Sequence, residues 1–252
     1  MTEPDSDAAI RRIAGWVRDA RKVVALTGAG ISVDSGIPDF RGPGGLWDRF
    51  DPMEYATLAA FLSRPEKVWE MIREMNAVIG AARPNPGHLA LARLEAMGKL
   101  AAIVTQNIDN LHQEAGSRTV IEFHGNGRHL VCLECGRRVA ADQAPRAEFP
   151  PRCSCPRQPV LKPDVVFFGE MIPQEAGTRA QAEAMGCDVM LVIGTSAVVA
   201  PASGIPWIAR KSGAMVAEIN LEPTPLTGSV AHESAWGSAS EILPRIVDLV
   251  AG

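Results

Sequence analysis

The sequence predicts an α/β protein with a Rossmann-like parallel sheet, helices on both of its faces, and a small discontinuous domain. Three observations lead to this fold class. Short apolar runs recur along the chain, helix-like stretches lie between several of them, and two segments interrupt the alternation. Strands that alternate with helices are typical of a parallel sheet that is covered on both faces. The two interrupting segments then belong to a smaller part that leaves the main sheet.

The composition fits a folded protein and excludes several classes. The chain has 252 residues, of which 46% are hydrophobic and 21% charged, so it can bury a core and is not globally disordered. Its formal net charge of −4 provides no basic field for a phosphate backbone, so we expect no direct nucleic-acid partner. Residues 1–7 are acidic and polar, unlike a signal peptide, and no apolar run approaches the roughly 20 residues that cross a bilayer. We expect a cytoplasmic protein without membrane binding, and a monomer is favoured.

The hydrophobic spacing predicts the elements in chain order. A helix is expected over 8–21, because Ile10, Ile13 and Val17 fall on one side of it. Buried strands are expected at the apolar runs 23–27, 101–105, 119–123, 165–168, 189–193 and 215–219. Helices are expected between several of these runs, at 88–97, 107–115, 174–185 and 203–212.

Two segments break the alternation and define the predicted domains. Residues 44–87 are mostly helical in pattern, and residues 127–162 contain clustered cysteines, prolines and arginines. We therefore predict that 1–43, 88–126 and 163–252 form a Rossmann-like domain that binds a nucleotide. The small domain comprises 44–87, a helical module, and 127–162, a cysteine module.

A glycine turn follows the first expected strand, as at many dinucleotide sites. Gly28-Ala29-Gly30 lets the backbone approach a pyrophosphate, but the usual G-x-G-x-x-G pattern is broken by Val33. A tight strand-to-helix turn is an equally good interpretation of these glycines alone. The loop that follows is less ordinary, because an acid, an aromatic ring and a guanidinium stand together in Asp39-Phe40-Arg41. Over a nucleotide they can orient polar groups, cover a ring and contact phosphate, whereas a surface Asp–Arg pair would contribute little.

Polar residues end the next two expected strands. Gln106-Asn107-Ile108-Asp109 follows the run 101–105, and His124-Gly125 follows the run 119–123. Side chains at the carboxyl ends of parallel strands face the ligand crevice of this architecture. Histidine suits general-base work near neutral pH, so His124 is the candidate base. The other four histidines, His88, His112, His129 and His232, are interpreted as structural.

Four of the five cysteines predict a metal site. Cys132 and Cys135 form a C-x-x-C pair, and seventeen residues separate it from the C-x-C pair of Cys153 and Cys155. Two thiolate pairs with a connector of this length fit a tetrahedral zinc site, although the C-x-C pair is tighter than usual. A closed shell of four sulfurs has no open position for water, so the expected role of the zinc is structural. Cys187 is expected to be a buried core residue.

Together these segments resemble the sirtuin family of NAD-dependent protein deacylases, of the bacterial or archaeal type. Further segments of the resemblance are Pro163-Asp164-Val165-Val166-Phe167-Phe168-Gly169-Glu170, Gly194-Thr195-Ser196 and Ile219-Asn220. The segments occur in the family's order and cover most of the chain. The resemblance implies an NAD site made by Gly28, Ala29, Gly30, Asp39, Phe40, Arg41, Gln106, Asn107, Asp109, Gly194, Thr195, Ser196 and Asn220. It implies that His124, Asn107 and Asp109 are catalytic. It also implies that Val165, Val166 and Phe167 pair with a substrate peptide as an added strand.

The implied activity is removal of an acyl group from a protein lysine. NAD is a co-substrate, His124 acts as general base on a ribose hydroxyl, and the products are nicotinamide, O-acyl-ADP-ribose and free lysine. Relatives that remove dicarboxylic acyl groups carry Tyr and Arg where this chain has Ile72 and Met75, so we expect neutral acyl groups such as acetyl. The alternatives are ADP-ribosyl transfer to protein and an NAD-sensing module without turnover. A hydride-transferring dehydrogenase fits least, because the G-x-G-x-x-G pattern is broken.

Overall fold

The structure, a computed structural model, describes residues 6–39, 45–144 and 149–252. Its contacts group into two compact units. Unit 1 comprises Met1–Ile37, Ala82–Phe123 and Gln174–Gly252, and unit 2 comprises Pro38–Ala81 and His124–Pro173. Residues 124–126 and 163–173, which are predicted to lie in the larger domain, group with unit 2 by their contacts, and residues 82–87, predicted to lie in the small domain, group with unit 1.

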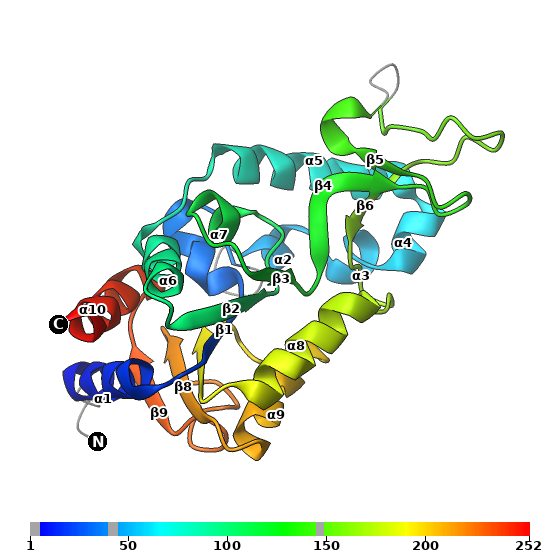
Figure 1. Cartoon of the computed structure of the whole chain (residues 1–252). Coiled ribbons are helices and arrows are strands. Elements are labelled where there is room, and N and C mark those ends of the chain that lie inside the picture. Colours follow the sequence, from blue (N-terminus) through cyan, green and yellow to red (C-terminus); the bar gives the residue numbers. More distant parts are fainter. Residues whose placement is uncertain (1–5, 40–44, 145–148) are drawn as a thin grey trace. The chain divides into compact units, whose positions relative to one another are not determined.

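Within its described residues, unit 1 contains a six-stranded sheet in the order β3-β2-β1-β7-β8-β9 (Figure 1). The strands are β1 (Val23–Thr27), β2 (Leu100–Thr105), β3 (Val120–Glu122), β7 (Val189–Ile193), β8 (Met215–Asn220) and β9 (Glu233–Trp236). Every neighbouring pair is parallel. All residues of β1 and β7 are buried, which explains why both strands are continuous apolar runs in the sequence.

Helices cover both faces of this sheet, as the sequence predicts. On one face α10 (Ala239–Ala251) packs against α1 (Ser6–Asp19) and α6 (Pro86–Ala96), and their apolar side chains share a core with alternate residues of the strands. The other strand residues point to the opposite face. There α8 (Gln174–Gly186) packs on α9 (Ile205–Lys211), which contacts β7 and β8. The short elements of unit 1 are η1 (Ala29–Ser35), α7 (Leu111–Glu114) and η3 (Ala202–Gly204).

Unit 2 combines short helices with a small antiparallel sheet. The helices are α2 (Leu46–Arg49), α3 (Pro52–Tyr55), α4 (Leu58–Ser63) and α5 (Pro65–Ala81), with η2 (Ala141–Gln143) in the cysteine module. The strands β5 (Arg138–Ala140), β4 (Gly125–Val131) and β6 (Lys162–Val165) pair in that order. Trp69 on α5 joins the two parts, because its ring nitrogen donates to the carbonyl of Leu161 at 3.0 Å. Within the described chain, no helix has the length and apolar character needed to cross a membrane.

Three elements differ from the expectation. The run 165–168 is not a strand of the parallel sheet, because β6 ends at Val165 and lies in the antiparallel sheet of unit 2. The helix expected over 107–115 is reduced to α7, since Asn110 before it has a left-handed backbone. The strand β9 is absent from the expected set, because its four residues, Glu-Ser-Ala-Trp, do not form an apolar run.

Candidate active site

The carboxyl ends of β1 and β7 meet where the strand order reverses, which is where ligands bind in open parallel sheets. Two glycine turns pack against each other at this point. The amides of Gly28 and Gly30 donate to the carbonyls of Ile193 and Gly194, at 3.0 and 2.8 Å. A Cβ on Gly30 would lie 2.7 Å from the Cα of Gly194, so no larger residue fits without a shift. Since their amides are already bonded, these glycines serve the close packing of the turns. The turn continues into the short 3₁₀ helix η1.

Gln106, Thr195 and Asn220 connect the strand ends on this edge of the sheet. The side-chain amide of Gln106 donates to the hydroxyl of Thr195 at 3.1 Å. The side-chain amide of Asn220 donates to the carbonyl of Thr195 at 3.0 Å. β2, β7 and β8 therefore present one continuous row of polar groups, and Ser196 beside Thr195 is exposed.

Asn107 and Asp109 lie in a buried hydrogen-bonded group around Ser32. The Asn107 amide donates to the Gly28 carbonyl and to the Ser32 hydroxyl, both at 3.1 Å. The Ser32 hydroxyl donates to Asp109 at 2.7 Å. The second oxygen of Asp109 accepts the backbone amide of Leu111 at 3.0 Å. The side chains of Asn107 and Asp109 are thus fixed before any ligand arrives, which favours selective binding of a polar ring or carboxamide.

Two further histidines pack beneath this group, with ring centroids 5.0 Å apart. His88 is the third residue of α6 and accepts the backbone amide of Asn85 at Nδ1, so its Nε2 carries the proton toward Ser32 at 3.4 Å. Burial lowers the pKa of His88 to about 4, although the charge of Asp109 opposes this. Burial, followed by the charge of His88, lowers the pKa of His112 to about 3. Both imidazoles are therefore neutral near pH 7.

Sequence reasoning missed this supporting shell of Ser32, Asn85, His88 and His112. They come from three separate segments, since Asn85 and His88 share one, and only the fold brings these segments together around Asp109. A local signal existed at Asn85-Pro86-Gly87-His88, which forms a capping box at the start of α6. It explains His88 as a helix residue but not as a neighbour of Ser32.

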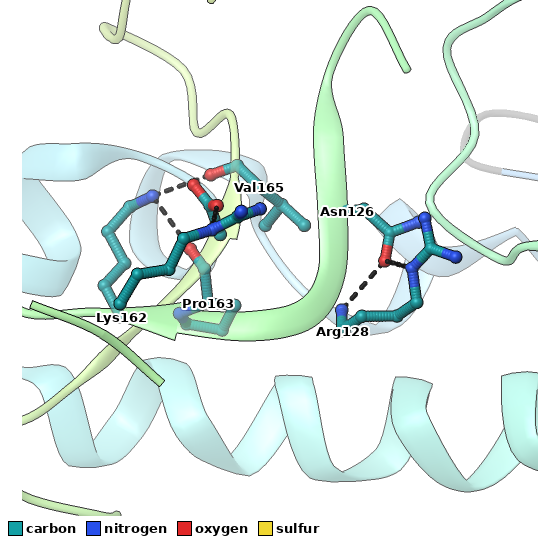
Figure 2. Close-up of polar contacts among 7 residues, drawn as sticks. Asn126, Arg128, Lys162, Pro163 and Val165 are labelled. Atoms are coloured by element: carbon teal, nitrogen blue, oxygen red, sulfur yellow. Dashed lines mark hydrogen bonds and ion pairs between the residues drawn. The ribbon is translucent and has the colours of Figure 1, made fainter. Parts of the chain in front are cut away.

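In unit 2, His124 is followed by a glycine that the fold requires. Gly125 has φ 74°, and a Cβ there would lie 2.3 Å from the carbonyl oxygen of Asp164. This close approach places β6 beside His124, whose carbonyl accepts the amide of Val166 at 2.8 Å. His124 is half-buried. The next residues are fixed as well, because the Asn126 side chain accepts both the backbone and the side chain of Arg128 (Figure 2).

The segment Val165–Phe167 begins at the last residue of β6 and lies beside His124. Val165 and Val166 are half-buried, whereas Phe167 is buried and packs edge-on against Phe61, with 5.9 Å between ring centroids. Asp39 belongs to unit 2 as well, where its carbonyl accepts the amide of Leu46 at 2.9 Å. The other two members of that predicted loop, Phe40 and Arg41, lie outside the described residues.

The four predicted metal ligands converge. The sulfurs of Cys132, Cys135, Cys153 and Cys155 all lie within 4.8 Å of one another. The sulfur distances are 3.9 Å for Cys132–Cys155 and 3.8 Å for Cys135–Cys153. Four sulfurs bound to one zinc ion at about 2.3 Å in a tetrahedron would lie about 3.8 Å apart. The residues therefore fit a closed zinc site despite the tight C-x-C pair. Cys187 is buried elsewhere and donates to the carbonyl of Ala184, as expected of a core residue.

Comparisons with known proteins agree with these observations. The model of the Sir2 family matches residues 28–201. The NAD-dependent protein deacylase 2 of Pyrobaculum aerophilum is 49% identical over 239 residues, which are 94% of each chain.

Solved structures give the same result. A structure described as the structural basis for the mechanism and regulation of Sir2 enzymes has a TM-score of 0.90 and 41% identity, covering 97% of this chain and 98% of that one. A Sir2–p53 peptide–NAD⁺ complex has a TM-score of 0.86 and 34% identity, covering 95% and 97%. The resemblance that the motifs suggested is thereby confirmed, and the chain belongs to the Sir2 family.

Proposed function

We propose that this chain removes acyl groups from lysine side chains of proteins and consumes NAD in doing so. As a member of the Sir2 family, it is an NAD-dependent protein deacylase. The main support for the proposed NAD site is the buried hydrogen-bonded group of Asn107, Ser32 and Asp109, which follows the ends of β1 and β2. Such a preformed polar group is suited to a nicotinamide carboxamide, which offers one acceptor and two donors.

The row of polar groups formed by Gln106, Thr195 and Asn220 at the edge of the sheet supports the remaining NAD contacts in unit 1. We assign Gly28, Ala29 and Gly30, with Gly194, Thr195 and Ser196, to the phosphates and ribose; the amides of the three glycines are already bonded, so these residues allow a close approach of the backbone rather than donating to phosphate. Gln106 is assigned to a ribose, and Asn220 at the end of β8 to the adenosine ribose. The hydrogen bonds of Thr195 to Gln106 and Asn220 support a shared site, because they hold the donors of three strands in one row.

In unit 2, His124 is assigned the role of general base toward a ribose hydroxyl. Its backbone bond to Val166 supports this role, because the base and the peptide-pairing segment Val165–Phe167 then move as one piece. The substrate is a protein or peptide that carries an acyl-lysine. Pairing through backbone groups imposes little sequence selection, so we expect peptide sequence to matter less than the acyl group.

The acyl group is proposed to be neutral. Ile72 and Met71 on α5 are buried in the apolar core of unit 2, and Met75 packs against the same core. A carboxylate placed among such side chains would lose its hydration without a cationic partner. Acetyl and longer apolar chains avoid this cost, and succinyl or malonyl groups do not.

The zinc site has a structural role. Cys132, Cys135, Cys153 and Cys155 would hold the ion, which supplies the cross-link between two loops of the cysteine module. The second pair follows a proline-rich segment, and the four-cysteine shell leaves no position for water. The ion therefore contributes to folding rather than to acyl transfer.

One assay tests the proposed function against its alternatives. The protein is incubated with NAD and an acetyl-lysine peptide, and nicotinamide and peptide mass are followed together. We expect coupled release of nicotinamide and loss of the acetyl group, with a succinyl-lysine peptide turned over much more slowly. A mass gain on protein without deacetylation would instead indicate ADP-ribosyl transfer. NAD binding without turnover would indicate a sensor.

The proposed activity needs only NAD and an acyl-lysine protein as binding partners. We propose a monomer in the cytoplasm that takes acyl-lysine proteins as substrates and binds neither nucleic acid nor a membrane. Sedimentation velocity of the purified protein tests the monomer directly, and a dimer that persists on dilution would contradict it.

A further inference from the structure

The strand that precedes the peptide-pairing segment contains a buried lysine that the proposed chemistry does not use. Lys162 begins β6, and its side chain is only 4% exposed. Burying an ammonium group is costly unless all of its donors find partners. The position of Lys162 therefore has to be explained by the groups that its ammonium contacts.

Each donor of Lys162 is satisfied within the same segment, and Figure 2 shows the two bonds to backbone carbonyls. Its Nζ donates to the carbonyl of Val165 at 2.6 Å and to that of Pro163 at 3.1 Å. It also lies 2.8 Å from the carboxylate of Glu170 and 4.3 Å from the centre of the Phe167 ring. The ammonium group therefore binds four residues of 163–170, and no distant element is needed.

Glu170 completes the arrangement from the other end of the segment. The carboxylate oxygen that pairs with Lys162 also accepts the backbone amide of Phe167 at 2.7 Å. The amide of Glu170 in turn donates to the carbonyl of Phe167 at 3.0 Å. Lys162 thus holds the Val165 end of the peptide-pairing segment, and Glu170 holds the Phe167 end.

The middle of the segment is tied to the residue that carries the candidate base. Val166 donates its amide to the carbonyl of His124. The Lys162–Glu170 pair and the His124 carbonyl therefore fix three consecutive residues from two sides. A segment that is already ordered loses less conformational entropy when a peptide strand is added to it.

We propose that Lys162 and Glu170 are positioning residues for the acyl-peptide substrate. They hold Val165–Phe167 in the shape that a peptide strand requires and in line with His124. This inference rests on the proposed function, in which that segment pairs with substrate. NAD binding by the residues of unit 1 does not depend on the pair.

The test separates peptide binding from NAD binding. In Lys162→Met we expect the KM for an acetyl-lysine peptide to rise about ten-fold or more, because two charge-assisted backbone bonds are lost. The affinity for NAD alone, measured by calorimetry, should change less than about two-fold. Glu170→Gln keeps the shape and an acceptor oxygen but loses the charge, so it should give a smaller rise in peptide KM. Lys162→Arg should recover part of the lost affinity.

Arg138→Met is the matched control. Arg138 pairs with Asp164 of the same strand β6 at 2.6 Å, but both side chains are exposed. Its loss should leave the peptide KM unchanged. If Lys162→Met does not fold, Glu170→Gln and Lys162→Arg still provide the comparison of peptide KM with NAD affinity.

Two results would overturn the proposal. One is an unchanged peptide KM in soluble, folded Lys162→Met or Glu170→Gln protein. The other is an equal loss of peptide and NAD affinity together with a lower melting temperature, which would indicate a purely structural pair. A wild-type protein that does not deacylate the peptide at all would instead contradict the proposed function.

Discussion

His124 is attached through its backbone to Val165–Phe167, the segment proposed to pair with a substrate peptide, so this attachment does not engage its side chain. The carbonyl of His124 accepts Val166, and the imidazole takes no part in that bond. We predict that His124→Ala lowers the turnover number for deacetylation by about 10²–10⁴-fold, as for a lost general base, and leaves NAD affinity largely intact. Steady-state kinetics and calorimetry measure the two effects. His129→Ala, on β4 in the same unit, is the control and should retain activity. Retained deacetylation in His124→Ala would rule out the base role.

Gly125 follows His124, the proposed base, and the fold requires a glycine at this position. Two features exclude a larger residue here. The backbone of Gly125 has a positive φ, and a Cβ at this position would lie 2.3 Å from the carbonyl oxygen of Asp164. We predict that Gly125→Ala destabilises unit 2 by at least about 1–2 kcal/mol, and that it weakens peptide binding because β6 must shift. Gly127→Ala is the matched control, because a Cβ there meets nothing within 4 Å. Urea unfolding of both variants should give clearly different midpoints, and equal midpoints would contradict the explanation.

Among the elements, the cysteine module depends most on a bound ion. Its strand β5 has only three residues, and the loops around it contribute few large apolar side chains to the core of unit 2. We predict that Cys153→Ser loses zinc and lowers the melting temperature, and that a strong chelator has the same effect on the wild type. Metal content is measured by atomic emission and stability by calorimetry. Cys187→Ala, a buried cysteine outside the cluster, should keep the full zinc content. A stable wild-type protein without zinc would refute this prediction.

The elements that the sequence predicts best are those with their own apolar period. β1 and β7 are buried along their whole length, and α1 has Ile10, Ile13 and Val17 on one face, so hydrophobic spacing is enough to find them. The sequence assigns the run that contains the end of β6 to the wrong sheet, because an apolar run does not reveal which strand it pairs with. It does not reveal β9, because a four-residue edge strand needs no apolar run.

The residues of the candidate site also fall into two groups, those that the sequence predicts and those that it does not. The cysteine ligands and the residues at strand ends follow from spacing and order, so the sequence finds them. Ser32 and His88 have no such pattern, and their positions beside Asp109 depend on how η1, α6 and the loop after β2 pack. Long-range packing of this kind cannot be derived from one sequence, because no local rule fixes it.

At the scale of the whole molecule, the buried polar group of unit 1 makes stability depend on pH. His88 and His112 are neutral in the fold, with pKa values lowered to about 4 and about 3, chiefly by burial. In the unfolded chain both would titrate near the ordinary value of about 6.5. Above that pH both states bind the same number of protons, so these groups add no pH dependence there.

Between about pH 6.5 and pH 4 the unfolded chain takes up protons at these histidines and the folded protein does not. The free energy of unfolding is therefore expected to fall as the pH decreases through this window, before most carboxylates titrate. In His112→Leu, which cannot take up this proton in either state, the slope of unfolding free energy against pH should be shallower than in the wild type. The comparison uses slopes from urea unfolding at several pH values, so a uniform loss of stability in the variant does not affect it. Identical slopes would mean that His112 titrates normally in the fold, and would contradict its burial among Thr27, His88 and the surrounding core.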